Sequence, residues 1–173
     1  MKLNVLLAFT LLTLAACSKK TDEELMSKAV EEHKSDNVEA ALEAYQEVID
    51  EFPESPRVPE AMYARAILFH DTQKDSRKSV EILRQLVAKF PDHATSSNAL
   101  FLTGFIYNNE LKIYDSARVV YQEFLKRFPT SPLVGDAKFE LENLGKDPAE
   151  IIKEKIEKTS PQASKSGVAA KKK

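Results

Sequence analysis

The dipeptide Phe-Pro occurs three times at a constant spacing of 38 residues, at Phe52-Pro53, Phe90-Pro91 and Phe128-Pro129. Apolar and small residues also recur every 38 residues. One such set is Ile49, Val87 and Leu125, and another is Ala61, Ala99 and Ala137. A period in this range is typical of structural units that stack on one another, because each unit is too small to bury its apolar face alone. The chain is therefore constrained to a repeat architecture.

The third copy shows what one repeat contains. After Ser97, apolar or small residues recur at steps of three and four, which predicts one face of a helix: Leu100, Phe101, Gly104, Phe105 and Tyr107. Asn108-Asn109 predicts a turn, and Asp115 is the predicted N-cap of a second helix whose apolar face reaches Phe128. Pro129 ends that helix, because proline disfavours helical geometry in the residue before it. Each repeat is therefore predicted to be a helical hairpin.

From roughly residue 23 to 145 this pattern resembles the tetratricopeptide repeat. Small residues stand where the two helices of each hairpin would cross: Ala29, Ala66 and Gly104 in the first helices, and Ala41, Ser79 and Ala117 in the second. A large residue follows four positions after each of the second set: Tyr45, Leu83 and Tyr121. The resemblance implies an all-α solenoid of about three hairpins, at 22–53, 54–91 and 92–129, closed by a capping helix within 132–145.

The N-terminus has the proportions of a signal peptide, since an apolar run from Leu3 to Ala16 is too short to span a bilayer with ease. It ends in Leu14-Ala15-Ala16-Cys17, which resembles the bacterial lipobox. The resemblance implies removal of residues 1–16 and a covalent lipid on Cys17, the only cysteine of the chain, followed by a tether at 17–22. The alternative is ordinary secretory cleavage beside an incidental cysteine. The residue that follows the cysteine is Ser18, which favours sorting of the lipoprotein to the outer membrane over retention in the inner membrane.

The C-terminal part is predicted to leave the repeat pattern after Gly145 and Pro148. Residues 148–158 are expected to form a short amphipathic helix whose large apolar residues are Ile151, Ile152 and Ile156. The Ser-, Ala- and Lys-rich tail at 159–173 is expected to be disordered. That tail holds four lysines and no acid, so the repeat region is more acidic than the net charge of −2 suggests. An acidic body disfavours nucleic acid as a partner.

No residue pattern typical of an enzyme or of a cofactor site was found. The three histidines, His33, His70 and His93, lie far apart without a second ligand at i+3 or i+4, so no metal site is predicted. Four scattered glycines exclude a phosphate-binding loop. We therefore expect no catalytic residue, no cofactor beyond the lipid and no small-molecule substrate. The alternative, an enzymatic function, would require a metal or substrate to bind near His70 and Asn108.

The first helices of such repeats line a concave surface, and we expect partners to bind there. Counted from the small residues, the predicted partner-binding groove consists of Met26, Val30, His33, Glu60, Tyr63, Ile67, His70, Asn98, Phe101, Phe105, Asn108 and Phe139. An aromatic centre with a polar edge is typical of a recognition surface. Two alternatives stay open: Tyr63, Phe101 and Phe139 pack between hairpins, or the 148–158 helix folds back into the groove.

The Phe-Pro-x-Ser-Pro junctions of a lipid-anchored repeat protein resemble the BamD family of outer-membrane β-barrel assembly lipoproteins, and Phe90-Pro91-Asp92-His93 is the closest local match. The resemblance implies a periplasm-facing scaffold of the outer membrane that holds a β-barrel assembly subunit or an unfolded barrel substrate. The repeats are also similar to those of the CpoB family, which is associated with Tol-Pal. That likeness implies the alternative of an adaptor for Tol-Pal, peptidoglycan or cell division.

Overall fold

The computed structural model describes residues 20–159, so the predicted signal peptide, Cys17 and the tail from 160 onward lie outside the described residues. All regular structure within 20–159 is helical. The helices are α1 (Asp22–Lys34), α2 (Val38–Glu51), α3 (Val58–Asp71), α4 (Ser76–Lys89), α5 (Ala94–Asn109), α6 (Tyr114–Arg127), α7 (Val134–Glu142) and α8 (Pro148–Thr159).

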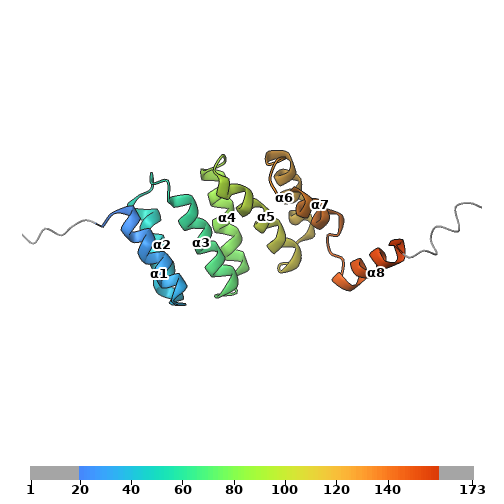
Figure 1. Ribbon diagram of the computed structural model, residues 1–173, viewed down its shortest axis with the longest axis horizontal. Coiled ribbons are helices and arrows are strands. Elements are labelled where there is room, and N and C mark those ends of the chain that lie inside the picture. Colours follow the sequence, from blue (N-terminus) through green and yellow to red (C-terminus); the bar gives the residue numbers. More distant parts are fainter. Residues whose placement is uncertain (1–19, 160–173) are drawn as a thin grey trace, which may run out of the picture.

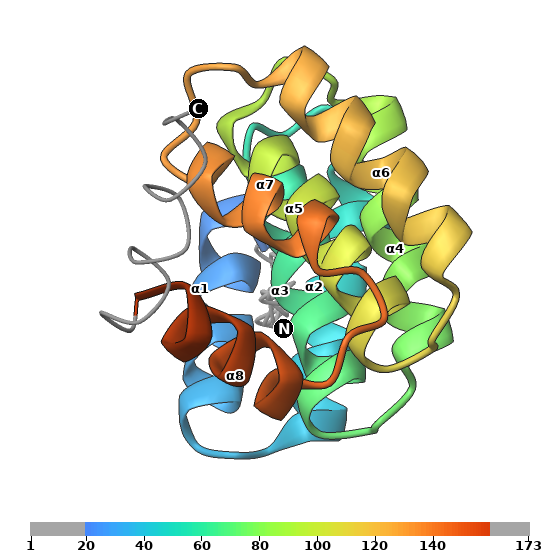
Figure 2. The same cartoon turned by 90° about the vertical axis from the view of Figure 1, so that its right-hand side faces the viewer.

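Successive helices pack as hairpins that stack side by side along one axis (Figure 1). The pairs α1–α2, α3–α4 and α5–α6 form the three hairpins, and α7 packs on α6. Helix α3 also contacts α5 directly, as expected when the first helices form the inner layer of a solenoid. The predicted all-α, tetratricopeptide-like solenoid is confirmed. Helix α8 lies beyond α7 at the end of the stack (Figures 1 and 2).

The backbone repeats at the same spacing as the sequence. Asp36, Lys74 and Lys112 turn the chain within the three hairpins, and each adopts a left-handed conformation with φ of 61°, 55° and 56°. Because the third turn copies the first two, α6 begins at Tyr114 with Ile113 at its N-cap position. The predicted N-cap Asp115 therefore lies in the first turn of the helix. Asn109 belongs to the last turn of α5, so the loop falls later than the two asparagines suggested.

The small residues at the helix crossings are buried as predicted. Ala29, Ala41, Ala66, Ser79 and Ala117 are fully inaccessible. Around them the core divides into two clusters, one between α1, α2 and α3 and a larger one that continues from α3 to α7. Tight packing across these crossings, and not helix propensity, supplies most of the stability of helices of this length. Helix α3 contributes residues to both clusters and so joins the two parts of the interior.

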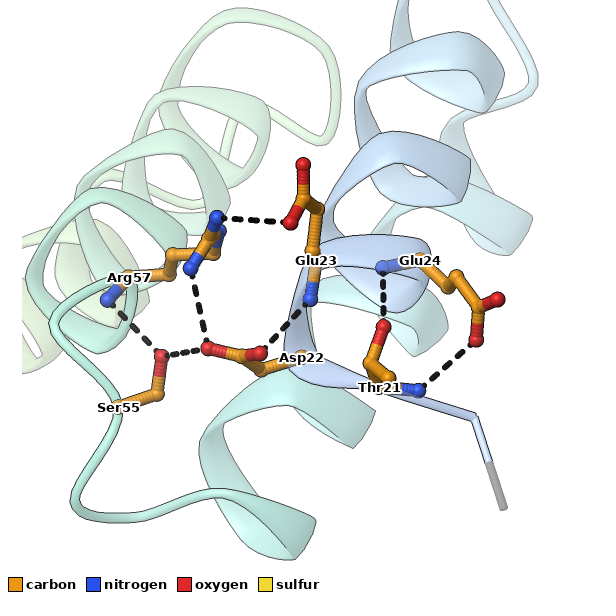
Figure 3. Close-up of polar contacts among 6 residues, drawn as sticks. All are labelled: Thr21, Asp22, Glu23, Glu24, Ser55 and Arg57. Carbon is orange, nitrogen blue, oxygen red and sulfur yellow. Dashed lines mark hydrogen bonds and ion pairs between the residues drawn. The ribbon is translucent and has the colours of Figure 1, made fainter. Parts of the chain in front are cut away.

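A polar network ties the start of α1 to the junction between the first two hairpins (Figure 3). The Asp22 carboxylate accepts hydrogen bonds from the Ser55 hydroxyl and, at 3.1 Å, from the Arg57 guanidinium. These contacts hold the pKa of Asp22 below its ordinary value, with the Ser55 hydrogen bond as the largest cause. Beside it, Thr21 and Glu24 form a reciprocal capping box that satisfies the first N–H groups of α1. The network therefore fixes the start of α1 relative to the junction between the first two hairpins.

Candidate protein-interaction surface

The predicted groove residues follow one side of the first helices, and the middle of that side is uncharged. Helix α5 lies between α3 and α7 and contains no acidic or basic residue from Ala94 to Asn109. Ile67 of α3 and Phe105 of α5, which stand 38 residues apart, are both partly exposed. Within the described residues, neither belongs to the two core clusters. These two side chains are therefore available to a partner, and depletion of charge is what distinguishes the centre of a protein interface.

Two of the predicted aromatic residues contribute more to the core than to the surface. Phe101 packs its ring against Tyr121 and Phe124, with centroids 5.8 and 5.9 Å apart. Tyr63 packs against the larger core cluster, and burial, with a smaller contribution from Asp71, raises the pKa of its phenol. For these two residues the structure favours packing between hairpins. Met26 and Val30 likewise pack against the N-terminal cluster while remaining partly exposed.

Three polar residues at the C-terminal ends of α1, α3 and α5 occupy equivalent positions: His33, His70 and Asn108. The first stays within its hairpin, where its Nδ1 lies 3.3 Å from the Tyr45 hydroxyl. The second reaches the next hairpin, since His70 Nε2 lies 3.0 Å from Glu110 while Nδ1 faces Asp71. His70 therefore connects two hairpins, and both histidines contact other side chains of the protein.

Asn108 is placed in the interior and is only 7% exposed. Its amide donates to Glu140 at 3.0 Å, and its carbonyl oxygen accepts from the Gly145 N–H at 3.2 Å. Both partners belong to the capping segment, so this side chain fastens α7 to α5. At the other edge of the surface, Glu60 and Asn98 are exposed, and the Glu60 carboxylate lies 3.4 Å from the Nε2 atom of His93.

Phe139 marks the C-terminal end of the predicted groove and is 38% exposed. The ammonium of Lys155 lies 4.6 Å from the centre of its ring, which brings α8 to this point. A cavity of about 260 Å³ opens between α7 and α8, lined by Phe139, Pro148, Ile151, Ile152 and polar residues that include Asn108 and Asn143. Helix α8 thus meets the groove at this end, and Figure 1 shows it continuing away from α3 and α5.

Several residues of this surface had no signal in the sequence. Glu110 and Lys155 owe their roles to partners that lie 40 and 16 positions earlier in the chain, at His70 and Phe139. The positions of His33, His70 and Asn108 were recognisable as a repeated polar position, because the three residues nearly share the 38-residue period.

The described residues offer neither a metal site nor a membrane-spanning helix. Among residues 20–159, no three His, Asp, Glu or Cys side chains converge to hold a metal ion. Over the same range, no helix combines the length and the apolar character needed to cross a bilayer.

A comparison with protein-family models matches residues 18–151 to the YfiO family, described as outer membrane lipoprotein. The match covers all three hairpins, the cap and the start of α8. A comparison with curated proteins gave no match. The family match confirms the resemblance to BamD-type tetratricopeptide lipoproteins. The chain therefore belongs to the YfiO family of outer membrane lipoproteins.

Proposed function

We propose that this protein is a non-enzymatic scaffold, anchored through a lipid on Cys17, that holds a segment of another envelope protein during outer-membrane protein assembly. The family match supports an outer-membrane lipoprotein. The observation that carries the binding role is the centre of the solenoid surface, where Ile67 of α3 and Phe105 of α5 are partly exposed and α5 has no charged residue. The bound segment is a β-barrel assembly subunit or an unfolded barrel chain.

The chemistry of this surface defines the segment it would accept. The apolar side chains of Ile67 and Phe105 would bury apolar residues of the partner at adjacent positions along the solenoid. Histidine–carboxylate contacts bound this centre, between Glu60 and His93 at one edge and between His70 and Glu110 at the other. A segment with apolar residues in the middle and polar residues at its flanks fits this arrangement, because its charges would meet the polar edges.

The experiment is affinity isolation of the intact lipoprotein from gently solubilised membranes, with the co-isolated proteins identified by mass spectrometry. The test variant is Ile67→Ser/Phe105→Ser, which changes two partly exposed side chains that belong to neither core cluster. The matched control is Val119→Ser, since Val119 on α6 is 62% exposed. We expect a β-barrel assembly subunit to accompany the wild type and the control, and to be lost from the double variant.

Two results would change the proposal. Recovery of Tol-Pal or peptidoglycan proteins would favour the alternative function, an adaptor that binds those proteins through the same surface. Equal recovery by all three forms would show that Ile67 and Phe105 do not bind the partner. The anchor is tested separately by Cys17→Ser, which we expect to remove the protein from the outer-membrane fraction and to abolish acylation of the N-terminal peptide.

A further inference from the structure

The imidazole ring of His70 is held between two carboxylates that come from different hairpins. Its Nδ1 atom is in hydrogen-bonding contact with Asp71, the last residue of α3, and its Nε2 atom lies 3.0 Å from the carboxylate of Glu110, which caps α5. Glu110 also accepts a hydrogen bond of 2.9 Å from the hydroxyl of Ser76, the first residue of α4. The His70 side chain is only 15% exposed. One shielded ring therefore joins the second hairpin to the third.

The equivalent side chains of the other two hairpins have different surroundings. His33 faces the Tyr45 hydroxyl, which can donate as well as accept a hydrogen bond, so a neutral ring satisfies this contact. Asn108 makes one contact as a donor and one as an acceptor, as suits an uncharged amide. At His70, by contrast, both ring nitrogens face carboxylate oxygens. This environment sets the second position of the column apart.

The number of N–H groups on the ring decides whether both contacts can be hydrogen bonds. A neutral imidazole donates from one nitrogen and accepts at the other, whereas a protonated imidazole donates from both. An ionised carboxylate can only accept. With a neutral ring, one of the two carboxylates would face a nitrogen lone pair and would have no hydrogen bond from the ring. Only the protonated ring donates to Asp71 and Glu110 together.

The charges around the ring also favour a cation at this position. The ring is faced by Asp71 from its own helix, by Glu110 from α5 and by the uncharged Ser76 from α4. Nearby, the Tyr63 phenol stays neutral because burial, with a smaller contribution from Asp71, raises its pKa. Within the described part of the chain, no lysine or arginine pairs with either carboxylate. The last turn of α3, where His70 stands, likewise favours positive charge.

We propose that the contact of His70 with Asp71 and Glu110, which we call the His70 clasp, joins the second and third hairpins in a proton-dependent way. The protonated ring donates to both carboxylates, and these charge-assisted hydrogen bonds fix α3 against the end of α5. The neutral ring loses one of them, and the junction then depends on its remaining contacts. The clasp therefore stabilises the protein at the acidic end of the range in which imidazole titrates, and this stabilisation is lost as the pH rises.

The His70 clasp lies beside the side chains of the proposed binding surface. Ile67 stands one helical turn before His70 on α3, and Phe105 belongs to the helix that Glu110 caps. The protonated clasp would hold Ile67 and Phe105 at a fixed separation, and a surface that is already ordered loses less entropy when it binds. A partner segment would thus bind more tightly in mildly acidic surroundings. This consequence rests on the proposed function, whereas the clasp itself can be tested without a partner.

The direct test is NMR of isotope-labelled imidazole nitrogens in the intact lipoprotein, kept in mild detergent without a partner. The chain has three histidines, so the His70 signals are identified by their loss in His70→Gln. The titration runs from about pH 8 to about pH 5.5, the range in which imidazole in water takes up its proton. The reference is the same ring in the urea-unfolded protein. We expect the folded His70 ring to keep both N–H protons to a higher pH than the unfolded ring.

Two glutamine variants connect that result to the clasp. Glu110→Gln replaces the carboxylate from α5 with an uncharged amide of the same shape, and it should remove much of the difference between the folded and the unfolded ring. Glu60→Gln is the matched control, because it removes the carboxylate beside His93 and should leave the His70 titration unchanged. Circular dichroism verifies that each variant remains helical.

Urea unfolding gives an independent readout. In His70→Gln the side chain keeps a donor and an acceptor but cannot take up a proton. As the pH falls over the same range, the urea midpoint of the wild type should rise relative to that of this variant. His93→Gln is the matched control, because one ring nitrogen of His93 accepts from the Thr95 N–H and the other faces Glu60, which a neutral ring satisfies. Its midpoint should keep a constant distance from wild type.

Two results would overturn the proposal. The first is a folded His70 ring that loses its second proton at the same pH as the unfolded ring, or at a lower pH. The second is a difference between the urea midpoints of wild type and His70→Gln that stays constant over the pH range. Neither result bears on the proposed function, because recovery of a partner by affinity isolation is measured separately on the Ile67 and Phe105 variants.

Discussion

The phenol ring of Tyr121 lies against Gly104 so closely that a Cβ added at residue 104 would stand 2.8 Å from the Tyr121 Cε1 atom. Tyr121 is fully buried in α6, and α6 packs on α5 at this point. Burial raises the pKa of the Tyr121 phenol, and the carboxylate of Glu140 acts in the same direction. The crossing of the third hairpin therefore requires that residue 104 have no side chain.

Gly104→Ala should destabilise the protein although alanine is the better helix former. The added methyl forces a buried aromatic ring to move, at a cost of about 1–3 kcal/mol, and Gly104→Leu should cost more. The measurement is urea unfolding followed by circular dichroism. Gly135→Ala in α7 is the matched control, because a Cβ there meets nothing within 4 Å. The control should gain up to about 1 kcal/mol, and a stable Gly104→Ala would contradict the assigned crossing.

The left-handed turn at Lys112 should be improved by glycine. A side chain at φ of 56° is strained, and Lys112→Gly should raise the unfolding free energy by roughly 0.5–1 kcal/mol after the entropy cost of glycine is included. Gln122→Gly is the comparison, since Gln122 is exposed within α6. It should lower the unfolding free energy by about 1 kcal/mol. If both glycines destabilise equally, the positive φ at Lys112 is wrong.

Asn108→Ala should loosen the C-terminal cap. The change removes the hydrogen bonds to Glu140 and to the Gly145 N–H, and the loss should be about 1–3 kcal/mol because one partner is charged. Hydrogen exchange of α7 amides should accelerate more than that of α1 amides. Asn109→Ala is the control, because Asn109 is exposed and its side-chain amide donates to the Phe105 carbonyl of its own helix. It should change stability by less than about 0.5 kcal/mol.

Asp22 should make stability depend on acid pH. Its folded pKa lies below the ordinary value of 3.8, so its stabilising effect is complete above that pH and is lost as the pH falls through the folded pKa. Asp22→Asn should therefore be less stable than wild type at neutral pH, and the difference should shrink below pH 3.8. Urea unfolding over a pH series measures this. A difference between Asp22→Asn and wild type that stays constant over the pH series would contradict the network in Figure 3.

The sequence by itself determined the helical hairpins, their number and their crossings. Phe52, Phe90 and Phe128 end the second helices at equivalent positions. This was predictable because a helix and its stop signal depend on residues within a few positions, and because each repeat confirms the others. Gly104 was likewise recognisable, since it stands where Ala66 stands one repeat earlier. In a repeat protein each repeat contacts only its neighbours, so many contacts join residues that are close in sequence and can be predicted from short stretches of the chain.

Only the tertiary structure decided what each side chain of the predicted groove does. It buried Asn108 under the cap, turned Phe101 toward Tyr121 and left Phe105 at the surface. It also joined Asp22 to Arg57 and placed Lys155 over Phe139. The physical reason is that a side chain of a first helix meets neighbours from the adjoining hairpin, and the angle between hairpins sets which neighbours these are. That angle results from packing over the whole interface, which no local pattern encodes.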